Sequence, residues 1–344
     1  MFTKYVVGHY QICLMLSVII PTRNRANLLQ LALQSLVSQT LSAEQFEILI
    51  IDNGSTDATK QISNSFRQQL KNCRYVFDPA PGLHVARHRG LLEARGDILV
   101  YADDDIQATP FWLEAIAENF AEPSVAMVGG NNYPIFMAPL PKWLEKLWHQ
   151  PLFGGQSIPA LSILSLPEGR REFSHFLVWG CNFSIRKQIL LAAGGFHPDA
   201  MPQELIRFRG DGETHVSQFI LNQGLICMFD SRASVHHAVP PERMTIDYFG
   251  KRAFLQAISD SYTQLRSTHQ SNQKLSLPEK LTRKIVASIK TIRDRLPAFK
   301  CHDDELHLLN QAITEGYKKG FAYHQKAYQI DPEVRAWVHK TNYY

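Results

Sequence analysis

The sequence predicts an α/β fold built on a mostly parallel sheet with helices on both faces. Short apolar runs alternate with amphipathic segments through the first 130 residues, which is the pattern of strand–helix–strand units. The runs are almost continuously apolar, as the strands of a sheet covered on both faces must be. Polar residues collect directly after several runs, where the ligands of open α/β sheets bind.

We expect the elements in this order: strand 16–20, helix 27–39, strand 46–51, a helix to about residue 70, strand 74–77, helix 84–94, strand 98–102, helix 110–120 and strand 125–128. Each apolar run stops at a turn-forming or polar residue, as at Pro21 and Asp52. Leu28, Leu31 and Leu36 recur at helical spacing in the first helix. The second helix follows capping side chains over 55–57, and Gly96 closes the third.

Three consecutive carboxylates, Asp103, Asp104 and Asp105, follow strand 98–102. Adjacent ionised side chains raise one another's pKa, so the cluster is costly unless a cation or several donors share its charge. Hard divalent ions bind such oxygen ligands and bring phosphate-bearing substrates with them. Taken alone, the cluster fits a helix-capping loop equally well. The carboxyl ends of the strands carrying Pro21 and Asp52 converge on the same sheet edge, which favours a binding site.

The composition is that of a globular protein, with 344 residues, 45% hydrophobic and 20% charged. No apolar run has the roughly 18 residues that a membrane-spanning helix needs. The first fourteen residues make a poor secretory signal, and Met15 is an alternative start to Met1. Five scattered cysteines without a Cys-x-x-Cys pair argue against a zinc finger or disulfide scaffold and favour the reducing cytosol.

The net charge of +4 is unevenly distributed, since residues 251–344 hold sixteen Lys and Arg against nine Asp and Glu. A charge this small does not indicate a nucleic-acid partner. Within this region, 281–296 has one apolar stripe surrounded by basic residues, which predicts an amphipathic basic helix. We favour its packing on the α/β domain over binding to a membrane surface. A cytoplasmic protein is expected, with peripheral contact at the inner membrane face as the alternative.

Two common nucleotide-binding motifs are absent from the sequence. It contains no Gly-x-x-x-x-Gly-Lys-[Ser/Thr] loop and no Gly-x-Gly-x-x-Gly after the first strand. This argues against a P-loop NTPase and against a dinucleotide-dependent dehydrogenase. A nucleotide would then be held by acidic side chains at several strand ends, with a metal ion on its diphosphate.

Seven segments occur in order between residues 16 and 250. They are Ser17-Val-Ile-Ile-Pro-Thr-Arg-Asn-Arg25, Ile51-Asp-Asn-Gly-Ser-Thr-Asp57, Gly82-Leu-His-Val-Ala-Arg87, Ala94-Arg-Gly-Asp-Ile-Leu-Val-Tyr-Ala-Asp-Asp-Asp105, Gly180-Cys-Asn182, Gly210-Asp-Gly-Glu213 and His237-Ala-Val-Pro-Pro-Glu-Arg243. Together they resemble family-two glycosyltransferases of the GT-A fold, whose Rossmann-like sheet is flanked by helices. The resemblance implies a catalytic domain over 15–250 and a mostly helical C-terminal extension over 251–344.

The resemblance also implies roles for individual residues. Asp52 would take the edge of the nucleotide base, Asp103 would face the ribose, and Thr22 and Arg87 would lie near the nucleotide. A uracil imide N–H suits a carboxylate acceptor, so the expected donor is a UDP-sugar. The implied nucleotide-sugar-binding residues are Pro21, Thr22, Arg25, Asp52, Arg87, Asp103, Asp104, Gly180 and Asn182, and the implied metal ligands are Asp105 and His237.

The metal ion expected from this pattern is Mn²⁺ or Mg²⁺, and a histidine ligand suits Mn²⁺ better. The family often has Asn after the arginine matched by Arg87, whereas His88 stands here. A hydrogen bond from that position is therefore not implied. Asn182 can donate to and accept from sugar hydroxyls, while for Trp179 a sugar contact and a place in the core are equally good interpretations. The apolar face that contains Trp143 favours a core position.

On the acceptor side, the resemblance assigns the catalytic base to Glu213, with Asp211 as the alternative. Glu213 precedes the apolar positions of an expected helix, so capping of the helix N-terminus is the other interpretation. Displacement at an anomeric carbon requires a base for the acceptor hydroxyl, and we favour that role.

The sequence as a whole predicts an inverting, metal-assisted glycosyltransferase of polysaccharide or glycoconjugate synthesis. The acceptor would be a saccharide or a lipid-linked or protein-linked compound. A sugar nucleotidyltransferase would need a glycine-rich first loop, and 21–25 contains no glycine. A non-catalytic protein that binds nucleotide sugars would keep the same binding residues and stays open as an alternative.

Overall fold

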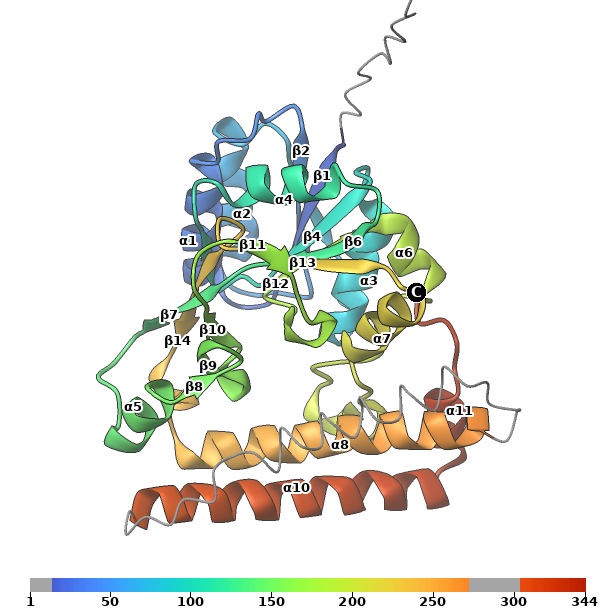
Figure 1. Ribbon diagram of the computed structural model, residues 1–344. Coiled ribbons are helices and arrows are strands. Elements are labelled where there is room, and N and C mark those ends of the chain that lie inside the picture. The colour runs from blue at the N-terminus through green and yellow to red at the C-terminus, as the bar shows by residue number, and fades with distance from the viewer. Residues whose placement is uncertain (1–13, 272–303) are drawn as a thin grey trace, which may run out of the picture.

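The computed structural model describes residues 14–271 and 304–344 (Figure 1). Met1, Cys13, Cys301 and the basic helix expected at 281–296 lie outside the described residues. Among the residues that are described, no helix is both long and apolar enough to cross a membrane.

A large mixed sheet forms the centre of the molecule. Its strand order is β11 (Arg170–Glu172), β13 (Ile226–Asp230), β6 (Val125–Gly129), β12 (Asn182–Arg186), β4 (Ile98–Ala102), β1 (Leu16–Thr22), β2 (Phe46–Asp52) and β3 (Cys73–Phe77). The run from β4 to β3 is parallel, as expected. Strand β12 is antiparallel to both of its neighbours, β4 and β6, and was not expected.

Strand β1 continues through Pro21 to Thr22, two residues past the expected end. Strand β4 pairs with β1 only as far as Ile19. The last residues of β1 therefore pair with β2 alone, where the ladder tolerates a residue without an N–H. The parallel register places Thr22 beside Asp52, so two of the expected site residues are neighbours on adjacent strands.

Helices cover both faces of the large sheet (Figure 1). Helices α1 (Ala26–Val37) and α4 (Trp112–Phe120) share a core with residues of one face, including Val18 and Ile20. Helices α3 (Leu83–Glu93), α6 (Lys187–Ala192) and α7 (Thr214–Asn222) share a second core with the other face, including Ile19. The alternation along β1 thus places successive apolar side chains in two different cores.

Two expected helices differ at their ends from the structure. Helix α2 covers only Thr59–Ser65 and continues as a short 3-10 helix over Phe66–Gln68. Asp57, which was expected to cap it, accepts from the backbone N–H groups of Ala26 and Thr59. It therefore joins the starts of α1 and α2. Helix α4 begins at Trp112 rather than at Pro110.

A second sheet was missed by the sequence analysis. Its order is β5 (Ile106–Ala108), β14 (Val235–Val239), β7 (Asn132–Phe136), β10 (Ile163–Ser165), β9 (Gly155–Ile158) and β8 (Pro151–Leu152). Strand β5 begins one residue after the acidic cluster and pairs with β14, in the register His237 with Ile106. The three aspartates therefore connect the two sheets, and His237 pairs with the residue that directly follows them.

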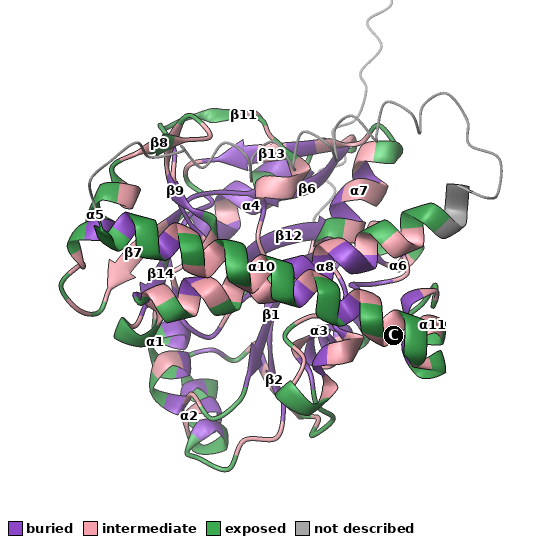
Figure 2. Ribbon diagram, turned by 90° about the horizontal axis from the view of Figure 1, so that it is seen from below, coloured by how far each residue is buried: buried purple, intermediate pink, exposed green. Residues whose placement is uncertain are grey.

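Beyond residue 240 the described chain is helical. It forms η5 (Pro241–Arg243), α8 (Ile246–Ser271), α10 (Asp304–Ile330) and α11 (Pro332–Val338). Helices α8 and α10 lie side by side along the molecule, and α10 turns an exposed face outward (Figure 2). A Cβ on Gly316 would lie 2.2 Å from the carbonyl oxygen of Gly250, so glycine permits this close packing.

Four short elements remain. They are α5 (Lys142–Trp148), η2 (Pro159–Leu161), η3 (His175–Leu177) and η4 (Gln203–Phe208). Trp143 and Leu144 of α5 are buried in a core shared with Phe249 of α8 and Leu306 of α10. The core position expected for the apolar face of α5 is confirmed.

Candidate active site

The acidic cluster sits at the carboxyl end of β4, and each of its carboxylates has different partners. Asp104 is buried and accepts hydrogen bonds from Thr22 Oγ1 at 2.8 Å and Arg25 Nη1 at 2.5 Å. Burial raises the pKa of Asp104 to about 7, against the opposing charge of Arg25. The first loop and the acidic cluster, about eighty residues apart in sequence, are thus joined directly.

Asp105 is surrounded by three nitrogen-bearing side chains. Arg25 Nη2 lies 3.1 Å from Oδ2, Arg243 Nη2 lies 3.3 Å from Oδ2, and His237 Nε2 lies 3.3 Å from Oδ1. Burial alone would raise the pKa of Asp105, but His237 and the two arginines hold it well below its usual range. The carboxylate is therefore ionised and available to a cation.

Asp103, Asp105 and His237 each offer one ligand atom within 4.8 Å of the others. Asp105 Oδ1 is buried and accepts no well-formed hydrogen bond, although His237 Nε2 lies 3.3 Å away, and a bound cation would satisfy such an acceptor. Asp104 is not part of this group, since Thr22 and Arg25 use its oxygens. Two carboxylates and an imidazole form a donor set that Mn²⁺ accepts and that Mg²⁺ also tolerates.

Arg87 of α3 connects the acidic cluster to Glu213. Its side chain is only 3% exposed, and Nη1 donates to Glu213 Oε1 at 2.8 Å. Nη2 lies 3.7 Å from Asp103 Oδ1. Burial disfavours the charged guanidinium, but Glu213 and Asp103 outweigh it and raise the pKa of Arg87. One buried cation therefore serves both carboxylates.

Gly180 allows this pair to form. A Cβ at position 180 would lie 2.0 Å from Arg87 Nη2 and 2.1 Å from Glu213 Oε1. No side chain fits between the backbone and the two charged groups. The expectation that Gly180 belongs to the site thus acquires a steric reason, which the sequence did not supply.

The two acids of the loop over residues 210–213, Asp211 and Glu213, differ in their surroundings. Glu213 stands at the N-terminus of α7 and its side chain is 23% exposed. Asp211 is 6% exposed and contacts His197 Nδ1 at 2.5 Å and Thr263 Oγ1 at 2.6 Å. A base must reach its substrate, so Glu213 is the better candidate of the two.

Asp52 lies at the end of β2, beside Thr22. It is buried, and its carboxylate accepts from the Ser55 backbone N–H at 2.7 Å and from the Tyr75 hydroxyl at 2.6 Å. Burial and the adjacent carboxylate raise the pKa of Tyr75. Tyr75 was not singled out in the sequence, because a tyrosine in a strand carries no local signal of such a contact.

A comparison with known protein families identifies the family to which this chain belongs. The model of the family described as "Glycosyl transferase family 2" matches residues 17–191, about half of the chain. The chain belongs to glycosyl transferase family 2. The matched range contains the first loop, Asp52, Arg87, the acidic cluster and Gly180.

Curated relatives of this family 2 chain bear names of glycosyltransferases. "Glycosyltransferase AglE" of Haloferax volcanii is 36% identical over 122 residues, covering 34% of this chain and 40% of that protein. "Validoxylamine A glucosyltransferase" of Streptomyces hygroscopicus subsp. jinggangensis is 28% identical over 201 residues, covering 54% of this chain and 47% of that protein. The chain thus spans less than half the length of these relatives.

Solved structures confirm the GT-A fold. The mannosyltransferase PcManGT from Pyrobaculum calidifontis, in complex with GDP-Man and Mn²⁺, matches with a TM-score of 0.56 and 17% identity over 94% of this chain and 83% of that chain. TarS of S. aureus matches with a TM-score of 0.53 and 17% identity over 94% of this chain and 50% of that chain.

Three residues of the family 2 chain, Asn182, Trp179 and His88, form hydrogen bonds or packing contacts inside the fold. Asn182 is buried; its Oδ1 accepts from Trp112 Nε1 at 2.9 Å and its Nδ2 donates to the Ala233 carbonyl at 3.0 Å. Trp179 packs against two core clusters. His88 Nε2 accepts from the Phe196 N–H at 2.9 Å, and burial lowers the pKa of His88 to about 3. Each of these side chains is held by contacts within the fold.

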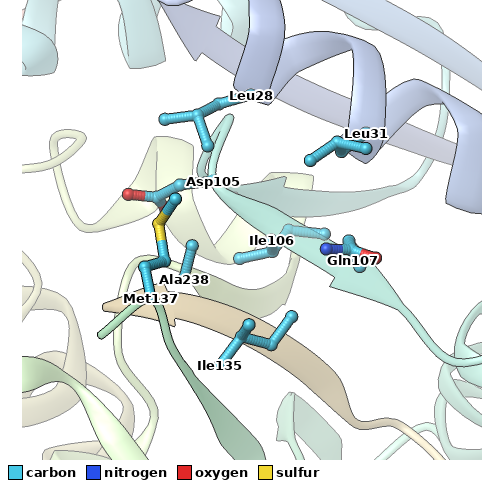
Figure 3. Close-up of a pocket in the computed structure, with 8 residues that line it drawn as sticks. All are labelled: Leu28, Leu31, Asp105, Ile106, Gln107, Ile135, Met137 and Ala238. Atoms are coloured by element: carbon cyan, nitrogen blue, oxygen red, sulfur yellow. The ribbon is translucent and has the colours of Figure 1, made fainter. Parts of the chain in front are cut away.

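A small pocket opens beside the acidic cluster, between α1 and strands β5, β7 and β14. Figure 3 shows Asp105 at its wall, with Leu28 and Leu31 on one side and Met137 on another. The eight lining residues are Leu28, Leu31, Asp105, Ile106, Gln107, Ile135, Met137 and Ala238. The pocket is mostly apolar, and it depends on the second sheet, which the sequence analysis missed.

Proposed function

We propose that this chain is an inverting glycosyltransferase that uses a nucleoside-diphosphate sugar, with UDP as the expected nucleotide. The observation that supports this most is the buried Arg87, whose guanidinium faces Asp103 on one side and Glu213 on the other. It connects a cation-binding acidic cluster to an accessible carboxylate. Donor activation and acceptor deprotonation need these two features next to each other.

The nucleotide would lie across the ends of β1, β2 and β4. Asp52 accepts a base N–H, and Tyr75 and Ser55 hold its carboxylate in place. Arg25 and Arg243 are 33% and 25% exposed and can donate to diphosphate oxygens. Mn²⁺ or Mg²⁺ held by Asp103, Asp105 and His237 would neutralise the leaving diphosphate. PcManGT, which shares the fold, was solved with GDP-Man and Mn²⁺.

Glu213 takes the proton of the acceptor hydroxyl as its oxygen bonds to the anomeric carbon. The bond from that carbon to the diphosphate oxygen breaks, and the leaving oxygen keeps the electron pair. Attack opposite the leaving group inverts the anomeric configuration. Arg87 supports this role because its contact at 2.8 Å holds the Glu213 carboxylate in place.

The names of the relatives support a proposal for the acceptor class. "Validoxylamine A glucosyltransferase" and "Glycosyltransferase AglE" name transfer of sugars, and we extend this to a saccharide, lipid-linked or protein-linked acceptor in polysaccharide or glycoconjugate synthesis. The residues 15–250 would act as the catalytic domain and 251–344 as its extension. A cytoplasmic enzyme, with or without peripheral membrane contact, agrees with this assignment.

The test measures nucleotide release from UDP-glucose, UDP-N-acetylglucosamine and GDP-mannose, with simple alkyl glycosides as acceptors, in Mn²⁺ or in EDTA. Glu213→Gln keeps the shape of the side chain but cannot take a proton. We expect it to bind UDP normally and to lose about 100-fold or more in transfer rate. Glu204→Gln, an exposed change in η4, serves as the control with full activity.

Three results would contradict the proposal. Transfer by Glu213→Gln at the wild-type rate would remove Glu213 from the reaction. A wild-type protein that binds UDP with Mn²⁺ but cleaves none of the donors would favour a non-catalytic nucleotide-sugar-binding protein. Formation of a nucleotide sugar from a nucleoside triphosphate and a sugar phosphate would favour the nucleotidyltransferase alternative.

A further inference from the structure

The loop that carries Glu213 is held from one side by α8. Thr263 Oγ1 donates to Asp211 Oδ2 at 2.6 Å. One turn earlier, Ser259 Oγ donates to the Gly210 carbonyl at 2.8 Å. Helix α8 begins at Ile246, well outside the range 17–191 that the family model matches. The C-terminal extension thus contacts the loop that bears the proposed base.

A second set of contacts, made by His197, also holds the loop. His197 Nδ1 donates to Asp211 Oδ1 at 2.5 Å, and the His197 N–H donates to the Gly212 carbonyl at 3.3 Å. The ring of His197 stacks on that of His215 in α7, with centroids 3.9 Å apart. His215 Nε2 in turn donates to the Ala193 carbonyl at 2.8 Å. Both ends of the loop are therefore tied to the rest of the domain.

The loop needs such contacts because its two glycines give the backbone high conformational freedom. Glycines flank Asp211 on both sides, and Gly212 has a φ of 55°, in the region that favours glycine. Two glycines increase the conformational entropy that ordering the loop must overcome. Buried hydrogen bonds to an ionised carboxylate are among the stronger ones available for that purpose.

Asp211 itself is poorly placed to touch a substrate. Its side chain is 6% exposed and that of His197 is 2% exposed. Each of the two oxygens of Asp211 already accepts a hydrogen bond, one from His197 and the other from Thr263. A carboxylate buried in this way cannot leave its partners without a large penalty. We therefore expect Asp211 to act through Glu213, which lies two positions further along the chain.

We propose that His197, Asp211 and Thr263 are positioning residues for Glu213. They fix the loop over residues 210–213 so that Glu213 Oε1 stays 2.8 Å from Arg87 Nη1 and faces the acceptor hydroxyl. This inference rests on the proposed role of Glu213 as the base. It assigns a task in the reaction to α8, while donor binding at Asp52 and the acidic cluster stays independent of it.

The experiment replaces Thr263 by valine, which keeps the shape and removes the hydroxyl. With the donor that the wild-type protein turns over, kcat should fall about tenfold or more, as small displacements of a catalytic group do. The donor KM and the affinity for UDP with Mn²⁺ should not change. Thr263→Ser should restore the rate.

The matched control is Thr268→Val on the same helix, where the hydroxyl donates to the backbone of Gln264. Thr263 makes the equivalent bond to the carbonyl of Ser259, so the two variants differ in the contact with Asp211. Thr268→Val should keep the wild-type kcat. Should Thr263→Val fail to fold, Ser259→Ala, which removes the bond to the Gly210 carbonyl, takes its place.

A double variant separates positioning from general stability. In the Glu213→Gln background, Thr263→Val should lower the rate no further, because it acts through the side chain already removed. Independently of turnover, hydrogen exchange of the Gly210 and Thr214 amides should become faster in Thr263→Val and stay unchanged in Thr268→Val. These amides donate to the carbonyls of Pro198 and Asp211.

The outcomes distinguish the two proposals. An unchanged kcat together with unchanged exchange in Thr263→Val would overturn the positioning role, and so would an additive loss in the double variant. If Glu213→Gln loses transfer while Thr263→Val does not, the positioning inference alone fails. If Glu213→Gln keeps transfer, the base assignment fails whatever the result at Thr263.

Discussion

Replacing Gly180 by alanine tests whether the Arg87–Glu213 pair organises the site. The added Cβ would lie 2.0 Å from Arg87 Nη2 and 2.1 Å from Glu213 Oε1. Ordinary contacts of a methyl carbon begin at 3.4 Å, so both groups must move by more than 1 Å. Gly180 is not among the positive-φ glycines, so alanine meets a steric conflict there and no backbone strain.

The size of the effect follows from the burial of the pair. Arg87 is 3% exposed and its guanidinium lies 5.5 Å from the centre of the Phe196 ring, so it cannot turn away into solvent. Breaking a buried ion pair by losing one partner costs about 3–5 kcal/mol. Because Glu213 is 23% exposed and regains water, we expect the lower end, about 3 kcal/mol. Displacement of the base by about 1 Å should lower transfer about 100-fold.

Urea unfolding and the transfer assay measure these two effects. The control is Gly154→Ala in the turn between β8 and β9, where φ is 89° and no atom lies within 4 Å of the added Cβ. It should cost about 1 kcal/mol through backbone strain and leave transfer intact. A Gly180→Ala protein with wild-type transfer and stability would refute the view that glycine is required here for the ion pair.

Two further predictions concern the metal site and the response to acid. Asp105→Asn should abolish the Mn²⁺-dependent part of the thermal shift produced by UDP, because the amide lacks the charge that binds the cation. The exposed change Asp247→Asn is the control and should keep this shift. An equal shift in both variants would count against the metal assignment. Burial lowers the pKa of His84, His215 and His324 to about 4, so the unfolded chain takes up protons between about pH 6.5 and 4 that the folded chain excludes. The contribution of these histidines should therefore be full above pH 6.5 and fall through this range, by about 3 kcal/mol at most for each. Because the raised pKa of Asp104 acts in the opposite direction, the measurement compares the wild-type protein with His324→Gln, and a difference in unfolding free energy that stays constant between pH 7.5 and 5 would contradict the assigned burial.

The sheet edge that carries the site was predictable because apolar runs locate strands well. Once strands over 16–20, 46–51 and 98–102 are recognised, parallel pairing brings their carboxyl ends together, and Asp52 and Asp105 with them. The second sheet was not predictable in this way. Its strands have two to five residues, too few for a periodic pattern to separate them from loops.

The side-chain contacts were harder to predict from the sequence than the helices and strands. Tyr75 reaches Asp52 across 23 positions, and Thr263 reaches Asp211 across 52; neither spacing leaves a local pattern. The choice between Asp211 and Glu213 depended on burial, which two acids so close in sequence do not reveal. Gly180 was quoted as part of a motif, but its reason is the position of Arg87, which comes from another helix.

The arginines of the site divide into two groups by exposure, and this division bears on the proposed reaction. Arg87 is buried and turns both Nη atoms toward carboxylates, so it is confined to Asp103 and Glu213. Arg25 and Arg243 are partly exposed and both reach Asp105. A guanidinium binds phosphate and carboxylate oxygens through the same N–H donors, so these two can exchange one for the other. Because Asp105 has His237 as a third partner, it stays paired when an arginine turns to a diphosphate, and the acidic cluster keeps its charge while the donor binds.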